Sequence, residues 1–99
     1  MNTLIENVKK WSEEKGIDKA DPSKQFLKVS EEVGEIAAAL ARDDREELID
    51  AIGDTIVTLI ILAQQNKLEV QDCLKHAYNV ISKRTGEMKN GVFVKQEDL

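Results

Sequence analysis

Residues 28–58 place carboxylates at helical spacing inside segments that are otherwise strongly apolar. This stretch contains Glu-Glu-Val-Gly-Glu at 31–35 and Glu-Leu-Ile-Asp-Ala-Ile-Gly-Asp-Thr at 47–55. An ionised carboxylate beside Ile, Val or Leu is costly unless water, a cation or a partner compensates its charge. A divalent cation between two helices would compensate several of these charges at once. We therefore predict that the fold holds these two helices face to face.

The composition is that of one globular domain spanning residues 1–99, because roughly 100 to 150 residues is the usual size of a single core. Hydrophobic residues make up 41% of the chain and charged residues 33%, which argues against disorder. Aromatic residues are only 4%, so aliphatic side chains and alanines must form the core. This composition favours an all-α, bundle-like protein.

Charge and cysteine content restrict the partners that we expect. The net charge is −5 and the isoelectric point about 4.9, which argues against a nucleic-acid partner. Cys73 is the single cysteine, so the chain has no internal disulfide and a reducing compartment is favoured. Residues 1–10 lack the apolar region of a signal peptide, and the apolar run at 55–63 is shorter than the roughly 20 residues of a membrane span. We expect a cytoplasmic protein without a membrane anchor.

Apolar periodicity predicts four helices. The first covers residues 3–15 and ends at Gly16, and the second begins with Asp21 as N-cap and Pro22 at its first position. Asp43, followed by Glu46 at capping-box spacing, is the predicted start of the third helix. The fourth begins near residue 70 and is expected to carry Arg84 on its apolar side. Residues 91–95 form a short extended C-terminal tail in this prediction.

The third helix is apolar on nearly every side beyond Asp54, so it needs burial on more than one face. The three neighbouring helices cannot easily cover its apolar surface. We therefore expect the fold to be completed by homo-oligomerisation, as a homodimer or a homotetramer. Gly34 and Gly53 interrupt the two acidic helices, and we expect them to allow close approach of those helices.

Helical spacing makes Glu32 with Glu35, and Asp50 with Asp54, two pairs of neighbouring carboxylates. Mg²⁺ prefers oxygen ligands and completes its shell with water and substrate phosphate, so two such pairs on antiparallel helices would form a magnesium site. The alternative is an ordinary solvated helix face, on which Lys28 pairs with Glu32 and acids near a helix N-terminus interact with the helix dipole.

These residues resemble the MazG-like all-α nucleotide pyrophosphohydrolases. The resemblance rests on Lys-Val-Ser-Glu-Glu-Val-Gly-Glu-Ile at 28–36, on Ile-Gly-Asp-Thr-Ile-Val at 52–57, and on a closing pattern that runs from Asn79 through Lys-Arg-Thr-Gly at 83–86 to Gly-Val-Phe at 91–93. The metal motif of the family is Glu-x-x-Glu followed by Glu-x-x-Asp. Glu32, Glu35 and Asp54 match it, whereas the remaining ligand position falls on Ala51. Asp50 is the best substitute on the same face, and Glu47 is the second choice.

The resemblance implies hydrolysis of a nucleoside triphosphate to the monophosphate and pyrophosphate, with Mg²⁺ as cofactor and Mn²⁺ as an alternative. The metal ligands would be Glu32, Glu35, Asp50 and Asp54. A carboxylate not fully used by the metal would orient water or take its proton, with Glu31, Glu35 and Glu47 as candidates. The remaining candidates would bind substrate: Lys28, Lys83 and Arg84 the phosphates, and Trp11 and Asn79 the base.

Two alternatives stay open. The first keeps the superfamily but changes the substrate to phosphoribosyl-ATP, although the closing pattern and the Ile-Gly-Asp sequence look less like that branch. The second is a non-catalytic helical dimer that uses the fold as a binding module. Ala51 keeps this second alternative open because alanine cannot bind a metal.

Overall fold

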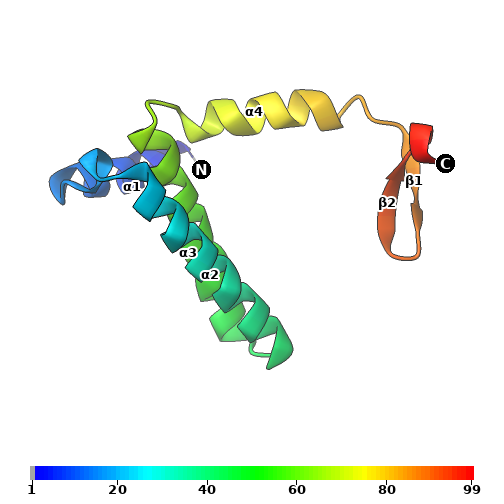
Figure 1. Cartoon of the computed structure of the whole chain (residues 1–99), viewed down its shortest axis with the longest axis horizontal. Coiled ribbons are helices and arrows are strands. Elements are labelled where there is room, and N and C mark those ends of the chain that lie inside the picture. The colour runs from blue at the N-terminus through cyan, green and yellow to red at the C-terminus, as the bar shows by residue number, and fades with distance from the viewer. Residues whose placement is uncertain (1) are drawn as a thin grey trace.

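Asp21-Pro22 is the predicted start of the second helix. In the computed structural model, helix α2 (Pro22–Ala41) begins there. The structure describes residues 2–99; Met1, which belongs to the predicted domain 1–99, lies outside the described residues. The Asp21 carboxylate accepts a hydrogen bond from the Ser23 N–H at 2.9 Å, as an N-cap does. Helix α2 runs antiparallel to helix α3 (Arg45–Gln65), and the two form the most extensive helix contact in the molecule (Figure 1).

The turn between α2 and α3 differs by one residue from the prediction. Asp43 adopts a left-handed conformation with φ 54°, and the N–H groups of Asp43 and Asp44 return to the carbonyls of Leu40 and Ala39. This is the Schellman arrangement that ends many helices. The N-cap of α3 is Asp44, whose carboxylate accepts from the Glu47 N–H at 3.1 Å. The predicted capping pair Asp43 and Glu46 was therefore wrong, because Asp43 is needed to end the preceding helix.

The core lies mainly along α3. Its buried apolar residues include Val29 and Ala39 on α2, and Ala51, Ile60 and Ile61 on α3. Polar groups tie the same helices together, since the Gln25 side chain donates to the Thr58 carbonyl at 3.1 Å. The expected role of Gly34 and Gly53 in close helix approach was wrong, because a Cβ at either position would meet no atom within 4 Å.

Helix α1 (Asn2–Glu14) packs across the C-terminal half of α3, as Figure 1 shows. Gly16, with φ 74°, ends the chain's first helical segment and leads into a short 3-10 turn, η1 (Ile17–Lys19). Gln65 of α3 donates to the Ile17 carbonyl at 2.9 Å. The first helix therefore agrees with the prediction to within one residue at each end.

Helix α4 (Val70–Ile81) projects away from the α2–α3 pair and buries none of its residues (Figure 1). A second Schellman turn, with Lys67 at φ 61°, redirects the chain between α3 and α4. Arg84 lies beyond the last helical residue, in the link to the C-terminal segment, so its predicted place on the apolar side of the fourth helix was wrong.

The C-terminal segment is a β-hairpin rather than an extended tail alone. Strands β1 (Gly86–Lys89) and β2 (Val92–Lys95) pair antiparallel, followed by the 3-10 turn η2 (Gln96–Asp98). Asn90 and Gly91 connect them with φ values of 52° and 82°, both positive, as a type I′ turn requires. The all-α class is confirmed by the four helices, with this small sheet as an addition.

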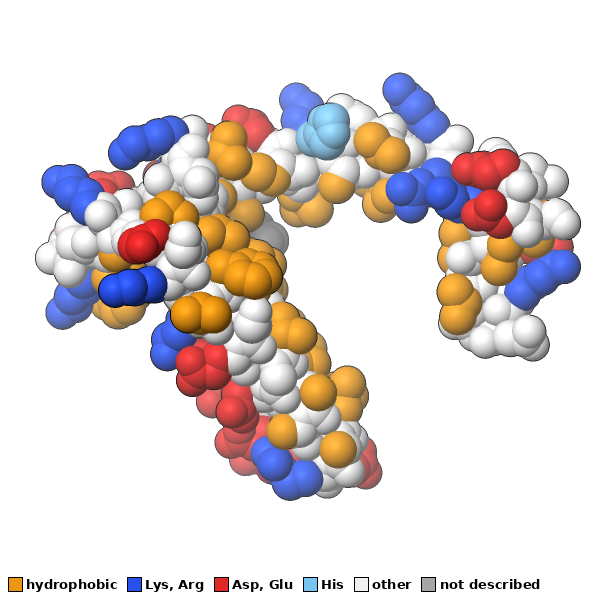
Figure 2. All heavy atoms as spheres, in the orientation of Figure 1, with side chains coloured by type: hydrophobic (Ala, Val, Ile, Leu, Met, Phe, Trp, Pro, Cys, Tyr) orange, Lys and Arg blue, Asp and Glu red, His pale blue; other side chains and the backbone are white. Residues whose placement is uncertain are grey.

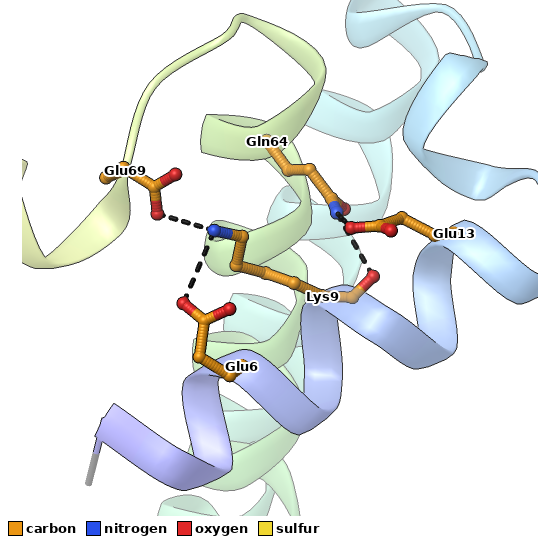
Figure 3. A network of polar contacts seen from close by, with 5 residues as sticks. All are labelled: Glu6, Lys9, Glu13, Gln64 and Glu69. Carbon is orange, nitrogen blue, oxygen red and sulfur yellow. Dashed lines mark hydrogen bonds and ion pairs between the residues drawn. The ribbon is translucent and has the colours of Figure 1, made fainter.

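A network around Lys9 fixes where α4 begins. The Lys9 ammonium lies 2.6 Å from a Glu69 carboxylate oxygen and 3.5 Å from Glu6 (Figure 3). Glu69 is the N-cap residue of α4, and the Lys9 carbonyl accepts a hydrogen bond from Gln64 of α3 at 3.1 Å. The hydrogen bond to Glu69 raises the pKa of Lys9 above its ordinary value, against the smaller effect of burial. One side chain thus links α1 to the start of α4.

The molecule is open and extended. Its radius of gyration is 16.3 Å, whereas a compact domain of this length has about 13 Å. The α2–α3 pair, α4 and the hairpin surround a concave space, and apolar side chains gather on its walls (Figures 1 and 2). Within residues 2–99, no helix is long and apolar enough to cross a membrane.

Candidate functional site

An acidic cavity of about 250 Å³ lies between α2 and α3. Besides Ala51, its lining consists entirely of carboxylates: Glu31, Glu32 and Glu35 from α2, and Glu47, Asp50 and Asp54 from α3. In Figure 2 acidic side chains line one flank of this helix pair. The structure therefore brings together all six residues predicted as metal ligands or catalytic carboxylates.

The short turn at Asp43 explains why these residues meet. In an antiparallel helix pair, residues equally distant from the turn stand at the same level. Glu32 and Asp54 are each eleven residues from Asp43, and Glu35 and Ala51 are each eight residues from it. The carboxylates of one helix thus face those of the other, turn by turn.

Ala51 lies at the level of Glu35, and its methyl group is 4% exposed. The cavity therefore has a small apolar side chain where the family motif has a fourth carboxylate. Asp50 and Glu47, the predicted substitutes, both line the cavity on the same helix. Both residues therefore remain candidates for the fourth ligand.

The donor chemistry of the cavity suits a hard divalent cation, because every ionisable group that lines it is a carboxylate. The side chains are not gathered into a finished cage. No three His, Cys, Asp or Glu side chains in the described part of the chain lie close enough together to hold a metal ion. Six carboxylates on one cavity repel each other, and a cation would relieve that repulsion by drawing several of them inward.

Lys28 is the predicted phosphate-binding residue nearest to the cavity in sequence. Its ammonium lies 3.7 Å from the Glu31 carboxylate, and both side chains are more than half exposed. An exposed ion pair of this kind contributes little to stability, so Lys28 can exchange Glu31 for an anionic ligand at small cost. The predicted alternative partner of Lys28, Glu32, does not form that ion pair.

Trp11 lines a different depression. It shares an apolar groove of about 340 Å³ with Leu4, Val8 and Val57, and its own side chain is half exposed. The structure therefore does not bring Trp11 into the acidic cavity.

The remaining predicted substrate residues lie on the arm of the molecule that α4, the link after it and the β-hairpin form (residues 70–95). Asn79 is on α4, and Lys83 and Arg84 follow it in the link to the hairpin. None of the three lines the acidic cavity. Figure 1 shows this arm separated from the α2–α3 pair by the concave space. Within one chain these residues and the carboxylates are not one site.

Sequence reasoning did not single out Lys9, although its network positions the whole arm. The signal was weak, because Lys9 and Glu69 are 60 residues apart and neither belongs to a motif. The importance of this pair can be recognised only from the tertiary contact between α1 and the start of α4.

Comparisons with known proteins place the chain in a family. The profile of the family described as phosphoribosyl-ATP pyrophosphohydrolase matches residues 1–92. An uncharacterised 18.2 kDa protein from the rep-hol intergenic region of Haemophilus phage HP1 is 36% identical over 70 residues. That match covers 70% of this chain but 43% of the phage protein, so the chain spans less than half of its relative. No solved structure matches the chain significantly.

The family match covers the four helices, the acidic cavity and the first residue of β2. It includes both halves of the acidic motif and most of the closing pattern on which the resemblance rested. The chain belongs to the phosphoribosyl-ATP pyrophosphohydrolase family, a branch of the MazG-like all-α nucleotide pyrophosphohydrolases.

Proposed function

We propose that this protein is a Mg²⁺-dependent pyrophosphohydrolase that cleaves a nucleoside triphosphate to the monophosphate and pyrophosphate. The observation that carries the proposal is the cavity lined by six carboxylates between α2 and α3. Membership of a pyrophosphohydrolase family supports it. Mn²⁺ has the same preference for oxygen ligands and is the expected substitute metal.

Glu32, Glu35, Asp50 and Asp54 are the proposed holders of the metal. Bound Mg²⁺ would neutralise phosphate oxygens and lower the pKa of a coordinated water. Glu31 and Glu47 line the same cavity outside this set, and Glu35 is shared between the two roles. One of these carboxylates accepts the proton of the attacking water as its oxygen bonds to phosphorus and the bond to the pyrophosphate leaving group breaks. Lys28 stabilises the departing phosphates.

Two substrate classes compete. The closing pattern of residues 79–93 favours ordinary or modified (d)NTPs. The description of the matching family favours phosphoribosyl-ATP, which carries the same triphosphate on an adenosine with an added ribose phosphate. Both substrates present the same scissile bond to the carboxylates, so the acidic cavity does not distinguish between them. The base contacts proposed for Trp11 and Asn79 would do so.

We also propose that the working form is a homo-oligomer, at least a homodimer. The chain exposes 7605 Å², about 1,900 Å² more than the 5,700 Å² or so of a typical monomer of its mass. A standard interface buries about 800 Å² on each partner, and obligate dimers bury more. In an oligomer Lys83 and Arg84 of one copy can approach the carboxylates of another, which would bring both into one substrate site.

The test is pyrophosphate release from a panel that includes canonical and modified (d)NTPs and phosphoribosyl-ATP, each with Mg²⁺, Mn²⁺ or EDTA. Asp54→Ala removes one proposed ligand, and Glu46→Ala is the matched control, because Glu46 lies on the same helix but does not line the cavity. We expect metal-dependent release by the parent protein and by Glu46→Ala, and a loss of at least 100-fold in Asp54→Ala.

Folded protein that releases no pyrophosphate from any substrate would contradict the enzyme proposal. In that case Ala51 has removed the activity, and the binding-module alternative takes its place. Equal activity of Asp54→Ala and the parent would instead place the chemistry outside this cavity.

A further inference from the structure

A large apolar cavity lies outside the acidic site. It is a groove of about 760 Å³ between α1, α3 and α4. Ile5, Leu59, Ala63, Val70 and Leu74 are among its walls. Its lining includes only two polar residues, Asn2 and Gln71. Small-molecule sites combine apolar walls with several convergent polar groups, so this groove is better suited to apolar side chains of a protein.

The β-hairpin at the other end of α4 lacks a packing partner. Within the described residues, its strands mainly contact each other and η2, and no helix packs extensively against them. A two-stranded hairpin is marginally stable on its own in water. It nevertheless exposes Met88 at 64% and Phe93 at 47%. The hairpin therefore needs a packing partner that covers these two side chains.

One face of the hairpin is suited to enter a groove. Met88 pairs with Phe93 across the ladder, so their side chains project from the same face. Glu87 and Lys89, the neighbours of Met88, project from the opposite face because side chains alternate along a strand. Lys95 projects from the same face as Phe93, opposite Gly86. Gly86 leaves room there for the Phe93 ring, since a Cβ would lie 2.8 Å from that ring and would clash with the Val94 carbonyl.

We propose that the Met88–Phe93 face of one chain docks in the α1–α3–α4 groove of a second copy, and that the second copy returns the same contact. Within one chain, α4 holds the hairpin away from its own groove (Figure 1). Groove and hairpin are both uncovered in every copy, so a two-fold exchange covers both and leaves no open surface to propagate. This inference rests on the homo-oligomer proposed above.

Charge favours the same occupant. Residues 82–95 carry four cations and one anion, a net charge of +3, whereas the whole chain carries −5. Residues 82–95 of one copy are therefore attracted to the acidic remainder of another, whose charge is −8.

The side chain of Gln71 gives a second reason for this occupant. Its side-chain carbonyl oxygen is buried at the groove without a hydrogen-bond donor in the described structure. An approaching strand edge offers unpaired N–H groups to such an acceptor.

The native Cys73 makes this contact measurable, because it lines the groove and is the single cysteine of the chain. Met88→Cys places a second thiol on the docking face. Val92→Cys is the matched control, since Val92 is equally exposed at 63% but projects from the opposite face. Both variants are oxidised with glutathione as an equal mixture of ¹⁴N- and ¹⁵N-labelled chains, and the linked peptides are identified by mass spectrometry. Parallel light scattering gives the oligomeric state of each protein.

We expect Met88→Cys to form a disulfide between residues 73 and 88 of different chains at least tenfold faster than Val92→Cys forms its own. A disulfide within one chain would overturn the proposal, because the hairpin would then occupy its own groove. A dimer by light scattering with no 73–88 linkage would also overturn it and leave the homo-oligomer standing. A monomer at all concentrations would refute both. Pyrophosphate release is measured separately, so none of these outcomes decides the enzyme proposal.

Discussion

Ala51 is the residue at which this chain departs most clearly from its family's metal motif. Its methyl group is buried at the level of Glu35, on the wall of a cavity that already holds six carboxylates. Ala51→Glu would restore the missing ligand but would add a seventh like charge to the apo protein. We expect a lower melting temperature in EDTA and a larger Mg²⁺-induced rise than in the parent, because metal binding to the native state stabilises it.

Ala51→Gln is the control for this prediction, since it adds the same bulk without the charge. It should lower the melting temperature without increasing the response to Mg²⁺. Differential scanning fluorimetry across a Mg²⁺ titration measures all three proteins. An identical Mg²⁺ response of Ala51→Glu and the parent would mean that position 51 does not face the metal.

Ser12 is the most completely buried side chain of the chain, with 0% exposure, and its hydroxyl has no hydrogen-bond partner in the described structure. A buried, unpaired hydroxyl costs about 1 to 3 kcal/mol of desolvation. Ser12→Ala removes the hydroxyl and leaves almost the same volume. We therefore expect the free energy of unfolding, measured by urea denaturation, to rise by about 1 kcal/mol. A fall of similar size would show that the hydroxyl is paired, for example with a buried water.

At the scale of elements, Asp43 carries a conformational cost at the end of α2. It occupies the left-handed C′ position that glycine adopts without strain. Asp43→Gly should raise the free energy of unfolding by up to about 1 kcal/mol, whereas Asp43→Val should lower it by more than that, because a β-branched residue is strongly strained there. Thermal and urea unfolding of both variants would measure this. A stabilising Asp43→Val would contradict the assigned turn.

The elements were predictable where local chemistry alone determines them. Asp21-Pro22, Gly16 and the apolar period predicted both limits of α1 and the start of α2 to within one residue. The start of α3 was predicted one residue too early because Asp43 and Asp44 are both good caps, and only the backbone geometry of the turn assigns one to each helix. Strand β1 was missed because its sequence, Gly-Glu-Met-Lys, has little β propensity of its own, although Asn90-Gly91 is a strong hairpin signal.

The acidic cavity was predictable because two local features determine it. These are the rotation of about 100° per residue along an α-helix and the short turn between α2 and α3. Glu32, Glu35 and Asp54 stand where the helical period and the antiparallel pair put them. Trp11 and Arg84 were not predictable in the same way. Their positions depend on how α1 crosses α3 and where α4 ends, and no local signal in the sequence determines these long-range contacts.

The Lys9 network predicts a pH dependence of the link between α1 and α4. The hydrogen bond to Glu69 raises the pKa of Lys9 in the folded protein above its ordinary value of 10.5. The folded state therefore holds this proton more tightly than the unfolded chain. The resulting stabilisation is fully present below pH 10.5 and is lost as the pH rises through the raised pKa.

Lys9→Met tests this dependence while keeping the aliphatic stem. We expect it to lower the free energy of unfolding by about 1 kcal/mol between pH 7 and about pH 9, since Glu69 is partly exposed and water weakens the pair. The difference from the parent should shrink above pH 10.5, where the parent loses the proton. Glu14→Gln, which changes a charge on the same helix outside the network, is the control. A difference that is constant up to pH 12 would contradict the assignment.

At the scale of the whole molecule, the apolar surface exceeds what one copy can bury. Phe26, Val33 and Leu40 follow each other at seven-residue spacing along α2, and each is at least 49% exposed. On α3, Ile52, Ile56 and Leu59 are also more than 40% exposed. These residues occupy the helical periodicity of a core face, yet within one chain nothing covers them. This pattern supports the homo-oligomer proposed above, in which a second chain would complete the core.

We therefore expect folding and association to be coupled. Stability that depends on a second copy rises with protein concentration by mass action, so the melting temperature should increase steadily between about 1 and 100 µM. A hundredfold change in concentration corresponds to about 2.7 kcal/mol for a dimer that unfolds directly to two chains. Calorimetry at several concentrations measures the shift, and Val33→Asp, which places a charge on the exposed face of α2, should abolish it and leave little folded protein. The matched substitution Lys24→Asp also adds a carboxylate to the exposed surface of α2, but it lies on the opposite side of the helix from the apolar row and should keep the dependence. A melting temperature that stays constant over this range would mean that one chain is stable by itself, with its apolar face left in water.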